Sequence, residues 1–106
     1  MAARIQIPAQ AKRGEVIEIR VIIQHPMETG TRHDAEGKLI RRNVINTFAC
    51  SYNGIDVFHA RLTSGIAANP FLQLYTVATE SGVLEFFWID DDGVQGTERR
   101  EIAVSG

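Results

Sequence analysis

An apolar residue at every second position of one segment constrains the fold of this chain most strongly. In residues 15–24 the apolar positions recur every second residue, at Ile17, Ile19, Val21 and Ile23. A period of two places successive side chains on opposite faces of an extended strand, so one face is buried and the other meets water. This pattern favours an antiparallel sheet covered on one side over a parallel sheet covered on both.

The dipeptide Asn53-Gly54 separates two further runs of this kind, residues 44–52 and 55–62. Asn-Gly favours a type I′ turn, because both central residues of that turn need positive φ. The sequence therefore predicts a hairpin. Its core-facing residues are Phe48, Cys50 and Tyr52 on the first strand, and Phe58, Ala60 and Leu62 on the second.

The same reasoning predicts the remaining strands. Residues 71–79 and 83–90 predict a second hairpin, and residues 97–104 a last strand after the Asp91-Asp92-Gly93 turn. Residues 3–7 predict a short edge strand that ends at Pro8. No stretch has helical periodicity, so the chain is predicted to be one all-β domain over residues 1–106. About seven antiparallel strands fit a β-sandwich, and an immunoglobulin-like sandwich without a disulfide is compatible with them.

Charge and cysteine content exclude several classes of protein. The net charge of −2 argues against a nucleic-acid binder, which usually carries a basic excess. A single cysteine excludes a disulfide scaffold, a C-x-x-C redox pair and a multi-cysteine zinc site. No apolar run reaches the roughly 18 residues of a transmembrane helix. The first residues lack the apolar core of a secretory signal, which taken alone predicts a cytoplasmic protein.

No catalytic or cofactor-binding constellation is recognisable. Cys50 lies mid-strand between two aromatic residues, so it is predicted to be a buried thiol rather than a nucleophile. The three histidines His25, His33 and His59 lack the paired spacing of zinc or copper ligands. The run Asp90-Asp91-Asp92-Gly93 resembles a calcium loop, but Trp88 and Arg99 would occupy ligand positions, so a turn is predicted instead. We expect no catalytic residues, no cofactor and no metal.

Two features suggest contacts with other proteins. The first is the charged loop at residues 25–43, which is either simply solvated or attracts an acidic partner. Its charged residues are Arg32, Asp34, Lys38, Arg41 and Arg42. The second is that the 71–79 and 83–90 strands are apolar on both sides. We expect a second protein to cover Phe71, Leu72, Tyr75, Phe87 and Ile89, the alternative being a thick core under long loops.

Several segments, in this order and spacing, resemble the SoxZ family, the small subunit of the thiosulfate-oxidation carrier complex. The resemblance covers nearly the whole chain, and only His33 and Arg41 depart from the expected pattern. The segments are HPMETG at 25–30, DAEGK at 34–38, YNG at 52–54, AANPF at 67–71, ATESG at 78–82 and WIDDDG at 88–93.

The resemblance implies an immunoglobulin-like, non-enzymatic subunit that pairs with SoxY. In that family SoxY carries the sulfur compound covalently on a cysteine of its C-terminal Gly-Gly-Cys-Gly-Gly arm, and periplasmic enzymes act on the adduct. The apolar residues above would then face SoxY, and the charged loop would dock pathway enzymes. Export together with a signal-bearing partner implies a periplasmic location. A homodimeric interaction module and a small metal-binding protein remain the alternatives, and the isolated chain is expected to be able to self-associate.

Overall fold

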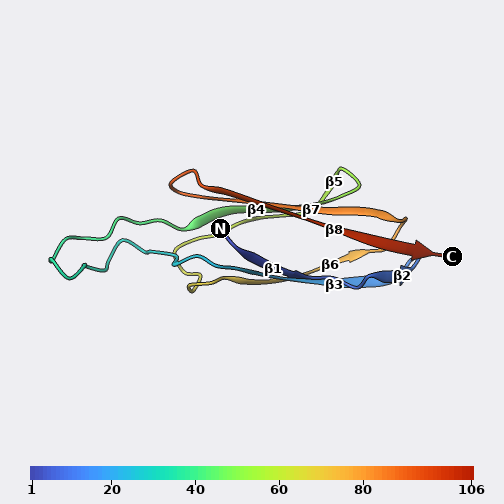
Figure 1. Ribbon diagram of the computed structural model, residues 1–106, viewed down its shortest axis with the longest axis horizontal. Coiled ribbons are helices and arrows are strands. Elements are labelled where there is room, and N and C mark those ends of the chain that lie inside the picture. Colours follow the sequence, from blue (N-terminus) through green and yellow to red (C-terminus); the bar gives the residue numbers. More distant parts are fainter.

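The computed structural model describes residues 1–106 and contains eight strands in two sheets that pack as layers (Figure 1). One sheet has three strands in the order β1-β3-β6, and the other has five in the order β2-β8-β7-β4-β5. The strands are β1 (Ala3–Gln6), β2 (Gln10–Lys12), β3 (Val16–Ile23), β4 (Ile45–Tyr52), β5 (Ile55–Arg61), β6 (Phe71–Val77), β7 (Gly82–Asp90) and β8 (Gln95–Ser105). The predicted all-β sandwich is confirmed, and no helix exists that is long and apolar enough to cross a membrane.

The core lies between the two layers and is built by the alternating residues. Ile17, Ile19, Val21 and Ile23 of β3 are buried as predicted, and they face Phe48 and the other inward residues of the opposite sheet. Burial of such side chains, at about 25 cal/mol per Å² of apolar surface, is the main force holding the layers together. The largest fully buried side chains are Trp88, Phe48 and Phe86.

The predicted Asn53-Gly54 hairpin joins β4 and β5. Both turn residues have positive φ, 49° for Asn53 and 83° for Gly54, as a type I′ turn requires. Tyr52 pairs with Ile55 directly across the turn. The ladder shifts register between Cys50 and Ser51, which leaves Val57 of β5 without a partner.

The predicted hairpin of residues 71–79 and 83–90 is wrong. β6 pairs with β3, whereas β7 pairs with β4 and β8 in the other sheet. The connecting residues cross between the layers: Ala78 is fully buried, and the Tyr52 hydroxyl bonds the backbone of Thr79 and Glu80. A short connection can join paired strands or strands of opposite layers, and alternation alone does not distinguish the two.

The structure also contains a strand that the periodicity did not reveal. β2 has only three residues, too few to show a period, and it runs parallel to β8. The sandwich is therefore antiparallel except at this one pair. The strands that were predicted agree with the observed ones to within two residues at each end.

Residues 25–43, called the arm below, leave the sandwich as an extended two-limbed ribbon (Figure 1). Bridges between Glu28 and Asn43 and between His33 and Leu39 hold the two limbs together. The arm contributes to the elongated shape of the molecule, whose principal extents are 60 × 19 × 18 Å.

Candidate protein-interaction site

The outer side of the five-stranded sheet, called the five-strand face, centres on Phe87. Phe87 and Ile89 of β7 point away from the core and are half-buried, because β7 lies in the middle of its sheet. The residues opposite Phe87 are small, Ala49 on β4 and Thr97 on β8. The aromatic ring therefore lies in a shallow depression rather than on a flat surface.

This depression has a volume of about 460 Å³ and a mixed lining. Phe87 supplies the apolar centre, small residues leave the space, and charges of both signs stand at the edge. Such a centre-and-rim arrangement is typical of protein interfaces. The lining residues are Ala49, Ser51, Asp56, Glu85, Phe86, Phe87, Thr97, Glu98 and Arg99.

The outer side of the three-stranded sheet, called the three-strand face, is more apolar and more exposed. Phe71 and Tyr75 of β6 are 54% and 56% exposed. A Glu18–Arg20 ion pair of 2.5 Å lies on β3, and the Gln73 amide donates to the Tyr75 hydroxyl at 3.0 Å. The exposed apolar residues of this face are Val16, Ile22, Phe71, Tyr75 and Val77.

The structure does not bring the predicted partner-facing residues into one surface. Phe71 and Tyr75 lie on the three-strand face, and Phe87 and Ile89 on the five-strand face, on opposite sides of the sandwich. Leu72 points inward and packs against the core. The expectation of a single two-sided apolar hairpin therefore fails, because β6 and β7 belong to different layers.

The tip of the arm is organised by Asp34. Its carboxylate accepts the backbone N–H groups of Glu36 and Lys38, both at 2.9 Å. Nearer the base of the arm, Arg32 pairs with Glu28 at 2.5 Å. The hydrogen bond from Arg32 lowers the pKa of the Glu28 carboxyl below its usual value. Two of the predicted docking residues are thus engaged within the arm itself.

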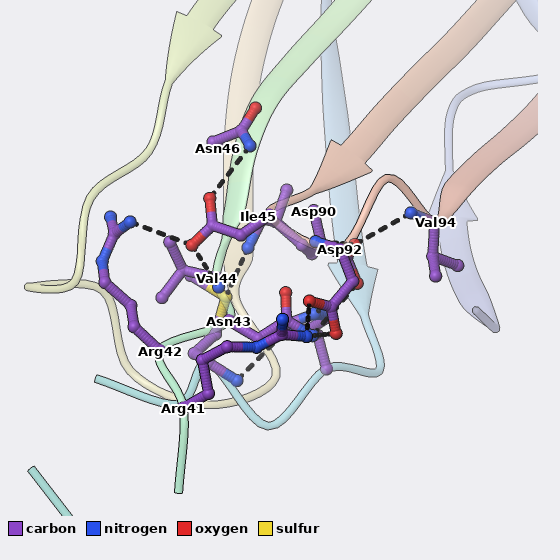
Figure 2. A network of polar contacts seen from close by, with 12 residues as sticks. Arg41, Arg42, Asn43, Val44, Ile45, Asn46, Asp90, Asp92 and Val94 are labelled. Carbon is purple, nitrogen blue, oxygen red and sulfur yellow. Dashed lines mark hydrogen bonds and ion pairs between the residues drawn. The ribbon is translucent and has the colours of Figure 1, made fainter. Parts of the chain in front are cut away.

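The base of the arm is fixed by the turn that follows β7 (Figure 2). Arg41 pairs with Asp92, and Arg42 pairs with Asp91 at 2.9 Å. The Asn46 amide also donates to Asp91, at 3.1 Å, and this bond is the main reason that the pKa of Asp91 is lowered. Arg41 and Arg42 therefore anchor the arm to the sandwich.

A buried pair lies beneath these surface contacts. His25 and Asp90 are only 4% and 5% exposed, and His25 Nε2 lies 3.1 Å from Asp90 Oδ2. His25 Nδ1 accepts the Met27 N–H, so the ring proton is on Nε2 and is donated to Asp90. Burial opposes ionisation of Asp90, but hydrogen bonds from Val94, His25, Asn43 and Asp92 outweigh it and lower its pKa.

The sequence did not reveal this network, although the triple aspartate was a visible signal. The turn at Asp91-Asp92-Gly93 is confirmed, with a φ of 81° at Gly93. The sequence pattern does not show that the same aspartates bind residues about fifty positions earlier in the chain. Of the five predicted docking residues, three form ion pairs, namely Arg32, Arg41 and Arg42. Asp34 accepts backbone N–H groups, and Lys38 takes part through its backbone N–H alone.

Cys50 is buried, as predicted for a core thiol. It has no exposed surface, and burial, together with the nearby Asp56 charge, raises its pKa to about 12. The histidines are dispersed: His25 lies at the base of the arm, His33 in the arm and His59 on β5. The structure brings together no group of three or more His, Cys, Asp or Glu residues that could hold a metal ion.

The sequence of the chain matches a known protein family over most of its length. The family model described as "Sulphur oxidation protein SoxZ" matches residues 5–101. The chain belongs to the SoxZ family. This confirms the resemblance found in the sequence and places the chain in sulfur oxidation. The comparison with curated proteins gives no significant match.

Solved structures share the fold of this SoxZ-family chain at low sequence identity. The sulfur carrier protein SoxY from Chlorobium limicola f thiosulfatophilum is 14% identical with a TM-score of 0.66, over 99% of this chain and 80% of its own. A superoxide reductase (neelaredoxin) from Ignicoccus hospitalis is 18% identical with a TM-score of 0.73, over 99% and 81%. A putative superoxide reductase from Thermotoga maritima is 14% identical with a TM-score of 0.75, over 98% and 86%. At these identities the likeness concerns the immunoglobulin-like fold alone.

Proposed function

We propose that this chain is the non-catalytic subunit of a sulfur-compound carrier complex, and that it binds a SoxY subunit through the five-strand face. Family membership supports the carrier role, and the depression around Phe87 is the observation that supports the choice of face. A partner side chain that enters this depression would cover Phe87 and remove water from the polar groups around it. A buried aromatic anchor surrounded by a polar rim is typical of the residues that dominate binding energy.

The burial of Cys50 argues that this chain does not itself carry the sulfur compound. The chain has one cysteine, and it is fully buried with a raised pKa. A thiol must be accessible and partly ionised to be loaded with a sulfur compound. In this proposal the covalent adduct is therefore carried by the C-terminal cysteine of SoxY, and this chain helps to present it to the enzymes of the pathway.

The arm is the second element of the proposal, as a docking site for pathway enzymes. It extends from the sandwich (Figure 1). Lys38 is exposed and lies in the turn that Asp34 organises. Because most other charges of the arm are paired within the protein, we expect docking to depend mainly on Lys38 and to weaken in high salt. Binding of a pathway enzyme to the complex should fall in the Lys38→Glu variant. Equal binding by that variant would contradict docking through the arm tip.

The proposal also includes a periplasmic location, reached by export together with the signal-bearing partner. Cell fractionation with and without the SoxY subunit tests it. The chain should reach the periplasm only when SoxY is co-expressed. A periplasmic chain in cells that lack SoxY would contradict joint export.

The decisive test of the pairing compares two Phe→Asp variants on opposite faces. The chain is co-expressed with the SoxY subunit of the same organism, and the complex is purified through a tag on SoxY. Phe87→Asp places a charge in the depression and should abolish co-purification. Phe71→Asp is the matched control on the three-strand face and should leave co-purification intact. Retention of Phe87→Asp, with the variant folded by circular dichroism, would contradict the proposed face.

A further inference from the structure

The strand β6 ends the three-stranded sheet with an unpaired edge. β6 pairs with β3 on one side and with no strand on the other. Such an edge exposes a row of backbone donors and acceptors and is a template for pairing with another chain. Natural edges are usually protected by charge, shortness, irregular register or a covering segment.

The other three edge strands of the sandwich carry such protection. β1 and β2 are only four and three residues long. β5 contains Asp56, His59 and Arg61, and its ladder with β4 is irregular. β6 is seven residues long, has the uncharged sequence FLQLYTV and pairs with β3 without a register shift. It is thus the one edge strand of this protein that is neither short, nor charged, nor irregular in its register.

The hydrogen bonds at both ends of β6 show which backbone groups are free. The Ile23 N–H donates to the Pro70 carbonyl at 3.1 Å, and the Ala78 N–H donates to the Glu15 carbonyl at 2.8 Å. Hydrogen-bonded pairs alternate along an antiparallel ladder, so the even-numbered residues between these ends bond to β3. The N–H and C=O groups of the odd-numbered residues therefore face the open edge. These residues are Phe71, Gln73, Tyr75 and Val77, and all four side chains are exposed.

We infer that β6 pairs antiparallel with β6 of a second copy of this chain, so that the three-stranded sheet continues across both copies. The register that pairs the whole strand places Phe71 opposite Val77 of the second copy, and Gln73 opposite Tyr75. In this register the residues that face the edge are the ones that meet, so each facing pair exchanges both of its backbone hydrogen bonds. The two-fold axis passes beside Leu74, as a self-complementary interface between identical chains requires.

The side chains on the outer face suit a second copy. The strand has no charge, so two copies meet without repulsion, and the Phe71–Val77 contact joins an aromatic to a β-branched residue. Ile22 lies beside Phe71, and Val16 lies beside Val77, on β3 of the same face. Pairing would extend these contacts into two apolar strips related by the two-fold axis, one at each end of the paired strands, with the Glu18–Arg20 pairs between them. The interface is a single strand wide, so we expect reversible dimerisation that depends on concentration.

The pairing does not compete with the proposed carrier interface, because the two surfaces lie on opposite sides of the sandwich. Both can be occupied at once, which gives an assembly of two copies of this chain and two carrier subunits. The inference stands on the geometry of β6 and does not require the carrier interface to be correct.

Sedimentation of the purified chain over a wide range of concentrations tests the pairing, with two variants altered at the same positions. Gln73→Lys with Tyr75→Lys places lysines opposite each other across the two-fold axis. We expect the dimer dissociation constant to rise about tenfold or more. Gln73→Glu with Tyr75→Lys is the matched control, because it places opposite charges across the axis and should retain the dimer. The new side chains also lie beside opposite charges on β3, the introduced glutamate beside Arg20 and the introduced lysine beside Glu18. Circular dichroism shows that both variants are folded.

Several results would overturn the inference. One is a wild-type chain that stays monomeric at every concentration, and another is equal weakening of the dimer by both variants. Loss of SoxY co-purification in the two-lysine variant would assign β6 to the carrier interface instead. Failure of the Phe87→Asp test would leave this dimer intact, so the two proposals fail separately.

Disulfide trapping tests the register. A mixture of Gln73→Cys and Tyr75→Cys chains should cross-link on mild oxidation, because facing residues of a hydrogen-bonded pair have Cα atoms about 5.5 Å apart, within disulfide range. Each variant alone should cross-link much less, since its introduced cysteine faces a non-cysteine residue. Cys50 is buried and supplies no background. Equal cross-linking by a single variant and by the mixture would contradict the proposed register.

Discussion

The two outer faces of the sandwich differ in how they present apolar surface. The five-strand face holds one aromatic ring, Phe87, in a depression at the centre of its sheet, with charges of both signs around it. The three-strand face carries its apolar side chains openly and ends in an unprotected strand. A depression selects a partner by the shape of an inserted side chain, whereas an open edge selects a partner by backbone pairing.

This difference follows from the position of each strand in its sheet. β7 is paired on both sides, so its outward residues are flanked by β4 and β8 and only side chains are available for contact. β6 is paired on one side, so its backbone is available as well. Two strands of similar composition, separated by a few residues in sequence, are therefore suited to different partners.

Removal of the shared core should produce the largest effect, because both faces rest on it. Trp88 is fully buried, and its indole lies against Gly96, where even a methyl group would come within 2.2 Å of the ring. We expect Trp88→Ala to cost about 3–5 kcal/mol of stability. Thermal unfolding followed by circular dichroism measures the loss. Both SoxY binding and self-association should then be lost, whereas each surface variant should lose only one of them. Loss of only one activity in Trp88→Ala would contradict the view that the same core supports both faces.

Filling the depression should have a smaller and selective effect. Thr97 lines the depression beside Phe87, and Thr97→Tyr would occupy the space without adding charge. We expect SoxY binding to weaken by about 2 kcal/mol, the size of a hot-spot effect, while stability and self-association stay unchanged. Calorimetric titration with SoxY measures the change. Ala103→Tyr is the control on the same strand outside the depression. An equal effect of both variants would contradict specific binding of SoxY in the depression.

A fall in pH should destabilise mainly the base of the arm and should affect the two outer faces least. The pKa values of Asp90 and Asp91 are lowered in the folded protein, so their ionised forms stabilise it above the usual aspartate pKa of about 3.9. This stabilisation is lost as the pH falls through the lowered values. Asp90→Asn should therefore reduce stability at neutral pH and make it less sensitive to acid.

Unfolding by denaturant at neutral and acid pH measures this dependence. The expected loss for Asp90→Asn at neutral pH is about 1–3 kcal/mol, since the change disturbs buried hydrogen bonds. Asp56→Asn, on the exposed strand β5, is the control and should change little. A wild-type protein and an Asp90→Asn variant with the same dependence on pH would contradict a role for this network in holding the arm.

Local signals predicted much of the fold, and long-range pairing was what they missed. Alternation identified the core residues of β3 and β4, and Asn53-Gly54 identified one hairpin, because both depend on neighbouring residues. The sheet to which β6 belongs depends on β3, about fifty residues earlier, and no local pattern encodes that choice. The wrong pairing of β6 also made the predicted interaction site wrong in its geometry, because residues expected on one surface lie on two opposite faces.

The same limit applies to the arm. Its charges were visible in the sequence, but the partners of Arg41 and Arg42 lie in the turn after β7, far along the chain. Charge alone suggested docking residues, whereas the structure shows that most of them hold the arm in place. Cys50 was predicted correctly because its environment is set by its own strand.

The mass of the intact co-expressed complex tests most directly whether the two faces bind different partners. Native mass spectrometry should show two copies of this chain with two SoxY subunits. Gln73→Lys with Tyr75→Lys should reduce the assembly to one copy of each, and Phe87→Asp should leave a dimer of this chain without SoxY. Two results would contradict the account. In the first, one of these variants loses both the dimer and SoxY. In the second, the two-lysine variant loses SoxY and the Phe87→Asp variant retains it.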